Sequence, residues 1–161
     1  MYLRSERESI VRVASPLQPT STLRRAVRAC SIAAMDMLSI VVIFVGAGVG
    51  ALVRAALGVL LNPLVPNLPL GTLAANLIGG LLMGIAMGLF AQYPGLSPAV
   101  RLAAVTGLLG GLTTFSTFSG ETASLLLRGE FAWTATIVAL HTMGSLLTTL
   151  AGYGAVRMLL R

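Results

Sequence analysis

The chain has 161 residues, of which 56% are hydrophobic and 10% are charged, and its formal net charge is +6. Because a soluble domain usually carries about 25% charged residues, this composition excludes an ordinary soluble domain and indicates an integral membrane protein. The single cysteine, Cys30, cannot form an intramolecular disulfide, so thiol redox chemistry is not indicated.

Residues 1–36 differ in composition from the rest of the chain, since they hold six arginines and no long apolar run. A secretory signal needs an apolar core after its basic start, and none occurs before Leu38. We therefore expect a basic N-terminal extension that is disordered or not translated, because a start at Met35 or Met37 would suit a membrane protein. The alternative is a basic arm that lies against anionic membrane lipid.

Four long apolar stretches follow, separated by short connections. They cover about Leu38–Leu61, Leu70–Gln92, Val100–Leu127 and Phe131–Leu159. Each reaches the ~20 residues that a helix needs to cross ~30 Å of hydrocarbon, and none alternates polar and apolar residues as a barrel strand does. The sequence therefore predicts an all-α membrane protein whose four transmembrane helices form one domain over residues 37–161.

The arginines near the ends of these stretches give only a weak orientation signal. One face would hold Arg101, Arg157 and Arg161, and the other would hold Arg128 with Arg54 close by. Arginines normally decide orientation by staying cytoplasmic, so this small difference leaves insertion in either direction open. A chain that inserts both ways can pair with its own inverted copy, and this hypothesis of dual topology depends on the later start site.

The first two stretches carry small residues at every fourth position, as close helix packing in a membrane requires. They are Gly46, Gly50 and Gly58 in the first stretch and Gly80, Gly84 and Gly88 in the second. The same row holds Asn76, whose amide needs partners at this depth and marks either a helix contact or a ligand contact. Thr72, one turn earlier, suits the first helical turn, where a hydroxyl can act as a cap.

The fourth stretch places His141, Ser145 and Thr149 on one helical stripe. A single hydroxyl in a membrane helix usually bonds back to its own backbone, but a histidine beside two hydroxyls favours a hydrated path. No second histidine, acid pair or thiol cluster accompanies this stripe in the sequence. A side-chain metal site or a catalytic triad is therefore not indicated, and we expect no enzymatic activity.

The segment "GLLGGLTTFSTFSGE" places helix-breaking glycines, hydroxyls and an acid inside the third stretch. Gly110 and Gly111 are poor helix formers, so the helix is predicted to break between them and Thr114. Broken backbone at membrane depth must be buried in protein or line a cavity, where its carbonyl oxygens can form a cation site. Phe115 and Phe118 follow on nearly one face. They either face lipid or pack in the core, or they turn their electropositive ring edges towards an anion.

These segments resemble the Fluc, or CrcB-type, fluoride channels over all four stretches. "GAGVGALVR" is similar to the family's first-helix glycine and arginine signature, and "PLGTLAANLIGG" is similar to its second-helix motif. "GLLGGLTTFSTF" is nearly the family consensus, and "MLSIVVIFVGAGVG" looks like a typical beginning. The resemblance implies a dual-topology antiparallel homodimer in the cell inner membrane, with a broken third helix, two pores and passive fluoride export. Its partners would be fluoride, membrane lipid and a second copy, with no nucleic acid.

The resemblance also implies a pore role for individual residues. Asn76 would be the pore amide, and the ring edges of Phe115 and Phe118 would line the fluoride path. The hydroxyls near the pore would be those of Thr72, Thr114, Ser145 and Thr149.

The remaining implied roles concern a cation and the pore entrance. The backbone oxygens of Gly110 and Thr113 would hold a structural sodium ion at the dimer axis. Arg54 and Glu121 would act in a vestibule or in gating. His141 departs from the family, which commonly has a tyrosine there, and it introduces a group that titrates near neutral pH.

Two other classes of protein remain compatible with parts of the sequence. A small dual-topology proton-coupled exporter would need an acid at its binding site, and the acid well inside a stretch is Glu121. A non-transporting scaffold subunit would need only the glycine rows. Neither class requires the segment from Gly110 to Phe118.

Overall fold

The structure is a computed structural model that describes residues 36–160. The expected basic extension, apart from its last residue Asp36, lies outside the described residues, as do Cys30 and Arg161. The expectations about an arm or a later start therefore stay predictions.

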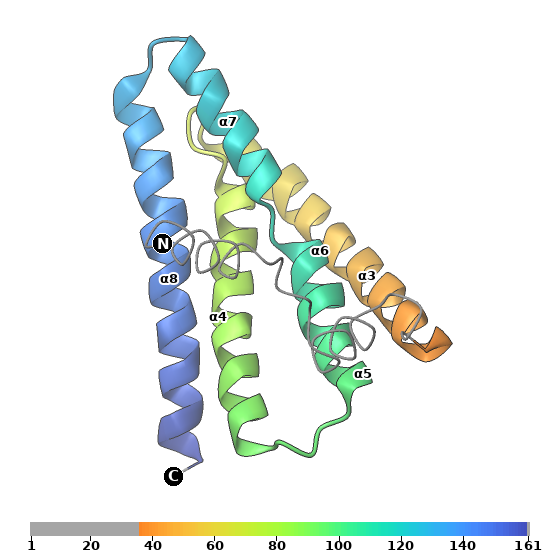
Figure 1. The fold of residues 1–161 in the computed structure, drawn as a ribbon. Helices are drawn as coiled ribbons and strands as arrows, with labels where there is room; N and C mark the ends of the chain where they lie inside the picture. Colours follow the sequence, from red (N-terminus) through yellow and green to blue (C-terminus); the bar gives the residue numbers. More distant parts are fainter. Residues whose placement is uncertain (1–35, 161) are drawn as a thin grey trace, which may run out of the picture. The chain divides into compact units, whose positions relative to one another are not determined.

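The described chain consists of helices joined by short connections (Figure 1). In chain order the segments are α3 (Met37–Leu61), η2 (Asn62–Leu64), α4 (Leu70–Gln92), α5 (Pro98–Arg101), η3 (Leu102–Leu109), α6 (Gly110–Leu112), α7 (Phe115–Leu127) and α8 (Phe131–Leu159). Segments α5 to α7 run through the third predicted stretch, and η3 is π-helical. Within the described residues, four helical stretches are long and apolar enough to cross a membrane, which confirms the prediction of an all-α, multi-pass membrane protein.

Local chemistry explains where these helices begin and end. The Asn62 side chain accepts a 2.7 Å hydrogen bond from the Gly71 backbone N–H and so caps α4. Thr72, which we expected to serve as a cap, donates its hydroxyl proton elsewhere. Helix α7 ends at Leu127 and is followed by Gly129, whose φ of 75° suits a residue without a Cβ. Glu130 then donates its backbone N–H to the Leu125 carbonyl.

Helices α4 and α8 pack closely because glycines lie at their contact. A Cβ added at Gly84 would meet the Thr149 backbone, and one added at Gly152 would meet the Leu81 backbone. Helix α3 packs in the same way, since a Cβ at Gly111 of α6 would meet the Ala47 backbone. Lipid supplies no hydrophobic drive for helix association, so such close approach provides much of the contact energy. The glycine rows of the sequence are thus packing surfaces.

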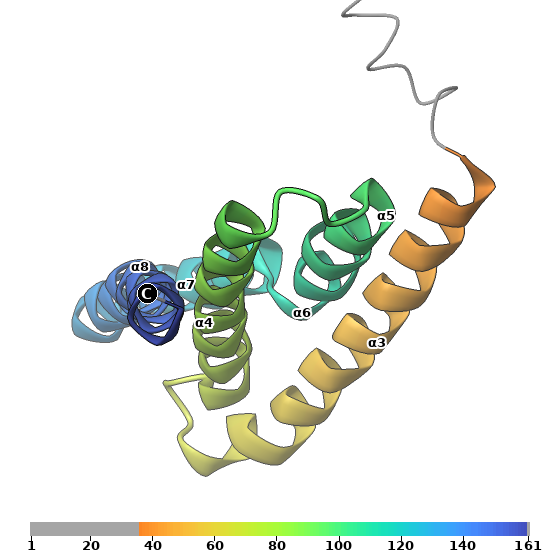
Figure 2. The ribbon, with the colours of Figure 1, turned by 90° about the horizontal axis from the view of Figure 1, so that it is seen from below.

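The third span changes sides around α4. Viewed along the helices, α3 and α6 lie on one side of α4, whereas α7 and α8 lie on the other (Figure 2). Phe118, Leu125 and Ile137 form a buried cluster between α7 and α8. The change of side takes place at Thr113 and Thr114, where the helical backbone is interrupted.

Candidate functional site

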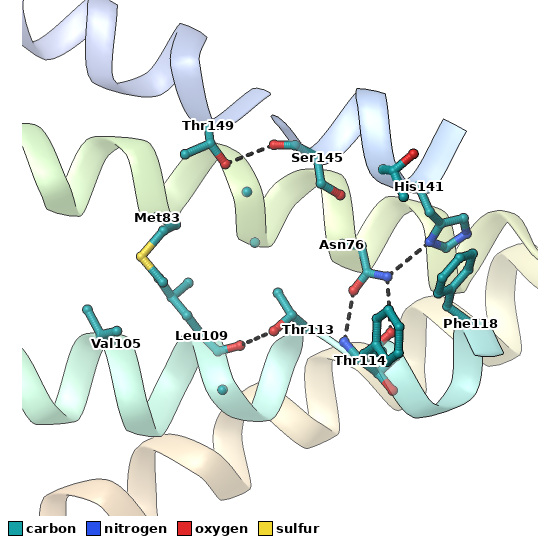
Figure 3. A pocket seen from close by; sticks show the side chains of 15 residues that line it. Asn76, Met83, Val105, Leu109, Thr113, Thr114, Phe118, His141, Ser145 and Thr149 are labelled. Atoms are coloured by element: carbon teal, nitrogen blue, oxygen red, sulfur yellow. Dashed lines mark hydrogen bonds between the residues drawn. The ribbon is translucent and has the colours of Figure 1, made fainter. Parts of the chain in front are cut away.

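A cleft of about 450 Å³ lies beside this interruption, between α4, α8 and the third span (Figure 3). Its wall combines an amide, an imidazole, several hydroxyls, two aromatic rings and apolar side chains. The lining residues are Asn76, Gly79, Gly80, Met83, Val105, Leu109, Gly110, Thr113, Thr114, Phe115, Phe118, His141, Thr142, Ser145 and Thr149. This wall carries polar groups but no acidic or basic side chain other than the imidazole.

Two residues, Thr113 and Thr114, leave the helical conformation. Their backbones are extended, with φ −79° and ψ 153° at Thr113 and φ −149° and ψ 115° at Thr114. The helix therefore continues through Gly110 and Gly111 and ends at Leu112. Thr114 then caps α7, because its Oγ1 accepts a 3.1 Å hydrogen bond from the Thr117 backbone N–H.

Asn76 of α4 satisfies the exposed backbone at this interruption. Its Oδ1 accepts a 2.8 Å hydrogen bond from the Thr114 N–H, and its Nδ2 donates to the Thr114 carbonyl over 3.2 Å. An unpaired backbone N–H or C=O group in hydrocarbon costs roughly several kcal/mol. The Asn76 side chain avoids this cost because it takes the place of helical partners that the Thr114 backbone has lost.

The diverted N–H groups leave two carbonyl oxygens without their usual helical donors. In an unbroken helix the Thr114 N–H would bond the Gly110 carbonyl, and the Thr117 N–H would bond the Thr113 carbonyl. Here the first N–H is donated to Asn76 and the second to the Thr114 hydroxyl. Gly110 and Thr113, which both line the cleft, therefore offer backbone oxygens of the kind that binds a hard cation.

His141 connects Asn76 to the aromatic rings. Its Nδ1 lies 3.0 Å from the Asn76 Nδ2, and its ring stacks on Phe118 with a centroid separation of 4.7 Å and an interplanar angle of 24°. Phe115 meets Phe118 edge to face, with centroids 5.5 Å apart. Phe118 is 8% exposed and Phe115 is 77% exposed. The two rings thus differ in setting, because one is fixed in the core and the other is free on the surface of this chain.

Thr72 and Glu121 form a second polar contact one helical turn along α4. The Thr72 hydroxyl donates a 2.7 Å hydrogen bond to Glu121 Oε1. Thr72 lines a separate cleft of about 250 Å³ together with Arg54, Thr114 and Thr117. Thr114, at the interruption, lines this cleft as well as the larger one.

Most of the predicted site residues therefore line two clefts that share Thr114. The larger cleft brings together six of the seven predicted pore residues, namely Asn76, Thr114, Phe115, Phe118, Ser145 and Thr149. Thr72 and Arg54 line the second cleft, and Glu121 lines a third, of about 190 Å³, with Arg128. The Thr149 hydroxyl donates a 2.8 Å hydrogen bond to the Ser145 carbonyl, so its proton is used within α8.

Sequence reasoning left the position of His141 open and did not identify Asn62 or Thr117. The helical stripe of His141, Ser145 and Thr149 was the sequence signal for His141, and the structure places all three residues in the cleft wall. Asn62 and Thr117 line the second cleft and lie in connections or at a helix start, where no periodic pattern marks them.

The fold and the clefts define an all-α, multi-pass membrane protein with a cleft beside an interrupted third span, whose wall combines polar and apolar groups without an acidic side chain. The sequence profile of the family described as "CrcB-like protein, Camphor Resistance (CrcB)" matches residues 41–153. The chain belongs to this CrcB family.

Named relatives agree with this assignment. The "Fluoride-specific ion channel FluC" of Nitrosospira multiformis is 53% identical over 125 residues, which are 78% of this chain and 98% of that protein. Proteins of the same name in Burkholderia pseudomallei and Burkholderia thailandensis are 56% and 55% identical over 116 residues. Those matches cover 72% of this chain and 89% of each relative. The region that the family profile matches, residues 41–153, includes every residue of the clefts described above.

Proposed function

We propose that this chain forms a fluoride-specific ion channel that exports fluoride passively and so lowers its cytoplasmic concentration. Relatives that are more than half identical carry that name, and it designates a channel rather than an enzyme. The observation in the structure that supports the proposal most strongly is the large cleft. It presents neutral donors and aromatic rings at the interrupted span, with no acidic side chain in its wall.

The chemistry of this wall suits a small, strongly hydrated anion. A selective pore must offset the cost of dehydration, yet each site must be weak enough to release the ion. Neutral hydroxyl and amide dipoles and the positive edges of aromatic rings would surround the ion in place of one full counter-charge. Asn76, Phe115 and Phe118, with the hydroxyls of Thr72, Thr114, Ser145 and Thr149, would form this path. Arg54 and Glu121 would lie at its vestibule or act in gating.

A second copy of the chain, inserted in the opposite orientation, would complete the channel as a dual-topology antiparallel homodimer. Much of the apolar surface of α3 is exposed in one chain, including Phe44, Leu52 and Val59, and it needs either lipid or a partner helix. Phe115, which is mostly exposed, would likewise gain a neighbour. The weak arginine bias between the two ends permits both orientations. We infer that the protein acts in this form in the cell inner membrane.

Sodium would fit the carbonyl oxygens of Gly110 and Thr113. Their helical donors are committed to Asn76 and Thr114, so these oxygens suit a cation that prefers oxygen ligands. Two such oxygens from each of two chains would give four ligands at the dimer axis. The ion would act structurally, by binding backbone oxygens at membrane depth whose usual helical donors bond elsewhere.

The proposal is tested by anion efflux from liposomes that contain the purified protein. Fluoride efflux should be passive, should need no proton gradient, and should greatly exceed chloride efflux. Equal leakage of chloride would contradict the proposed selectivity. Replacing sodium with N-methylglucamine on both sides of the membrane should reduce fluoride efflux. An unchanged rate would count against the structural sodium ion alone.

A further inference from the structure

A cavity that the proposed function does not use lies where α4 and α8 end. It has a volume of about 250 Å³ and is lined by Gly88, Ala91, Gln92, Tyr153 and Arg157. Figure 1 shows the C-terminal ends of both helices at the same end of the bundle, opposite the connection between α7 and α8. The cavity therefore lies at one end of the span and apart from the clefts beside the interruption.

Arg157 brings unused hydrogen-bond donors to this cavity. Its guanidinium lies over the Tyr153 ring, with the central carbon 6.0 Å from the ring centroid. Within residues 37–160 the guanidinium has no hydrogen bond, and the ion pair of that range joins Arg128 to Glu130 instead. A guanidinium carries five N–H donors, so Arg157 can bind an anion without giving up a contact with the protein.

Arg101 shows how an arginine near the same end is used when the protein itself satisfies it. Its Nη2 donates to the carbonyl oxygens of Phe90, Tyr93 and Pro94 over 3.4, 3.2 and 3.3 Å. The same guanidinium lies 4.7 Å from the centroid of the Phe90 ring. Arg101 thus stabilises the connection after α4, whereas Arg157 has only the Tyr153 ring beside it.

No carboxylate of residues 37–160 is near enough to pair with Arg157. The acidic residues of that range are Glu121 and Glu130. Glu121 bonds Thr72 in the first turn of α4, whereas the cavity lies at the last turn of that helix. Glu130 directly precedes α8, so the rise of an α-helix places it about 40 Å from Arg157.

The length of α8 places Arg157 in the headgroup region of a membrane. The helix has 29 residues and is therefore about 43 Å long, which exceeds the ~30 Å of hydrocarbon that it crosses. Arg157 lies in its last turn. A basic residue there also offsets the negative end of the helix dipole, but that role requires neither a cavity nor a neighbouring ring.

An apolar stripe on α8 leads from the middle of the span to this cavity. The stripe consists of Met143, Leu146 and Leu150, and each of these side chains is more than half exposed. Together with Tyr153 and Arg157 they follow one another at alternating spacings of three and four residues, so all five share one helix face. This face thus joins an apolar surface at membrane depth to a free positive charge at the membrane end.

We propose that this cavity binds the headgroup phosphate of an anionic phospholipid, and that an acyl chain of the same lipid lies along the apolar stripe. The Arg157 guanidinium matches two phosphate oxygens with two parallel N–H groups. The Tyr153 hydroxyl and the Gln92 amide, which line the same cavity, are further donors. Basic pockets between transmembrane helices bind such headgroups. The proposal concerns a lipid site and does not depend on fluoride transport.

The test uses fluorescence quenching by lipids with brominated acyl chains, on the full chain reconstituted in phosphatidylcholine. Leu150→Trp in a Trp133→Phe background leaves a single tryptophan, which lies on the stripe. Brominated phosphatidylglycerol should quench it with about fivefold higher apparent affinity than brominated phosphatidylcholine, the usual effect of one arginine near a charged headgroup. Adding Arg157→Gln should remove this preference.

Arg128→Gln is the matched control, because Arg128 is paired with Glu130 at the other end of α8. It should leave the preference unchanged. All variants retain the arginines of residues 1–36, so lipid attracted by those residues contributes equally to each. The inference is overturned if both lipids quench equally, if the preference survives Arg157→Gln, or if Arg128→Gln removes it too.

Two other occupants give different results in the same experiment. If a second copy of the chain covers the stripe, neither brominated lipid quenches the tryptophan. If the cavity takes a soluble anion, inorganic phosphate removes the preference, whereas sodium chloride of equal ionic strength does not. Either result overturns the lipid site.

A second measurement needs no substitution on the stripe. Phosphatidylglycerol added to the detergent-solubilised protein should raise its unfolding temperature more than phosphatidylcholine does, because a ligand that binds the folded state stabilises it. This difference should disappear in Arg157→Gln and persist in Arg128→Gln. An equal rise with both lipids in the parental protein contradicts the proposal.

Discussion

Thr72 Oγ1 and Glu121 Oε1 are joined by a 2.7 Å hydrogen bond between α4 and α7. Thr72 lies one turn before Asn76, which holds Thr114 and His141. Two consecutive turns of α4 therefore hold the site together. Thr72 in the first turn binds the Glu121 carboxyl group, and Asn76 in the next turn binds the Thr114 backbone and the His141 imidazole. Helix α4 therefore sets the relative positions of three groups that lie 38 to 65 residues along the chain from their partners on α4.

The first prediction concerns the partner of the buried carboxyl group. Thr72→Val keeps the shape of the side chain but removes the donor to Glu121, whose Oε2 is already unpaired among the described residues. We expect the free energy of unfolding to fall by roughly 1–3 kcal/mol, the usual cost of leaving a buried polar group unsatisfied. Thermal unfolding of the detergent-solubilised protein measures this.

A double-mutant cycle supplies the control for that substitution. In the Glu121→Gln background the same Thr72→Val change should cost less, because a neutral amide is cheaper to bury unpaired than a carboxylate. An equal cost in both backgrounds would show that Thr72 contributes through packing and not through its bond to Glu121.

The second prediction separates a channel from a proton-coupled exporter. Glu121→Gln retains an oxygen that can accept from Thr72 but can no longer gain or lose a proton. A passive channel should still conduct fluoride in this variant, with no requirement for a proton gradient. Efflux from liposomes with and without an imposed pH difference is the measurement. If transport by the parental protein needs the gradient and collapses in Glu121→Gln, the exporter is the correct class.

The third prediction concerns the two aromatic rings. Phe115→Ile and Phe118→Ile each remove a ring edge, and we expect each to suppress fluoride efflux at least about tenfold. Their effects on stability should differ. Phe118 belongs to the buried cluster with Leu125 and Ile137, so its replacement should cost roughly 1–3 kcal/mol, whereas that of exposed Phe115 should cost little.

Phe131→Ile is the matched control for Phe115→Ile, because Phe131 is 69% exposed and lies at the start of α8, outside the clefts. It should conduct like the parental protein. Parental conduction in both Phe115→Ile and Phe118→Ile, with the dimer intact, would show that ring edges play no part in permeation.

The sequence predicts some parts of this molecule well, for physical reasons. The four apolar stretches are evident because each must be about 20 residues long to cross the hydrocarbon, and the structure begins and ends α4 and α8 at the predicted residues. The stripe of His141, Ser145 and Thr149 was visible because residues four apart share a helix face. Both signals are local and periodic.

Contacts between distant residues left no such signal. The low helix propensity of Gly110 and Gly111 suggested a break, yet the helix continues through them to Leu112, and Gly111 packs closely against Ala47 of another helix. The backbone leaves the helix at Thr113 and Thr114, and Asn76 from another helix accepts a hydrogen bond from the Thr114 N–H. The bond between Asn76 and His141 spans 65 residues, so no pattern in either segment could indicate it.

The last prediction tests the α4–α8 contact that supports the site. An alanine Cβ at Gly152 would meet the Leu81 carbonyl oxygen and the Ile85 backbone, so Gly152→Ala should force the helices apart and destabilise the protein by roughly 1–3 kcal/mol. It should also weaken fluoride efflux, because α8 carries His141. Gly154→Ala, two residues along the same helix, meets nothing within 4 Å and should gain roughly 0.5–1 kcal/mol from helix propensity. If both variants unfold at a higher temperature than the parental protein, or both at a lower one, the close packing of α4 on α8 does not determine stability.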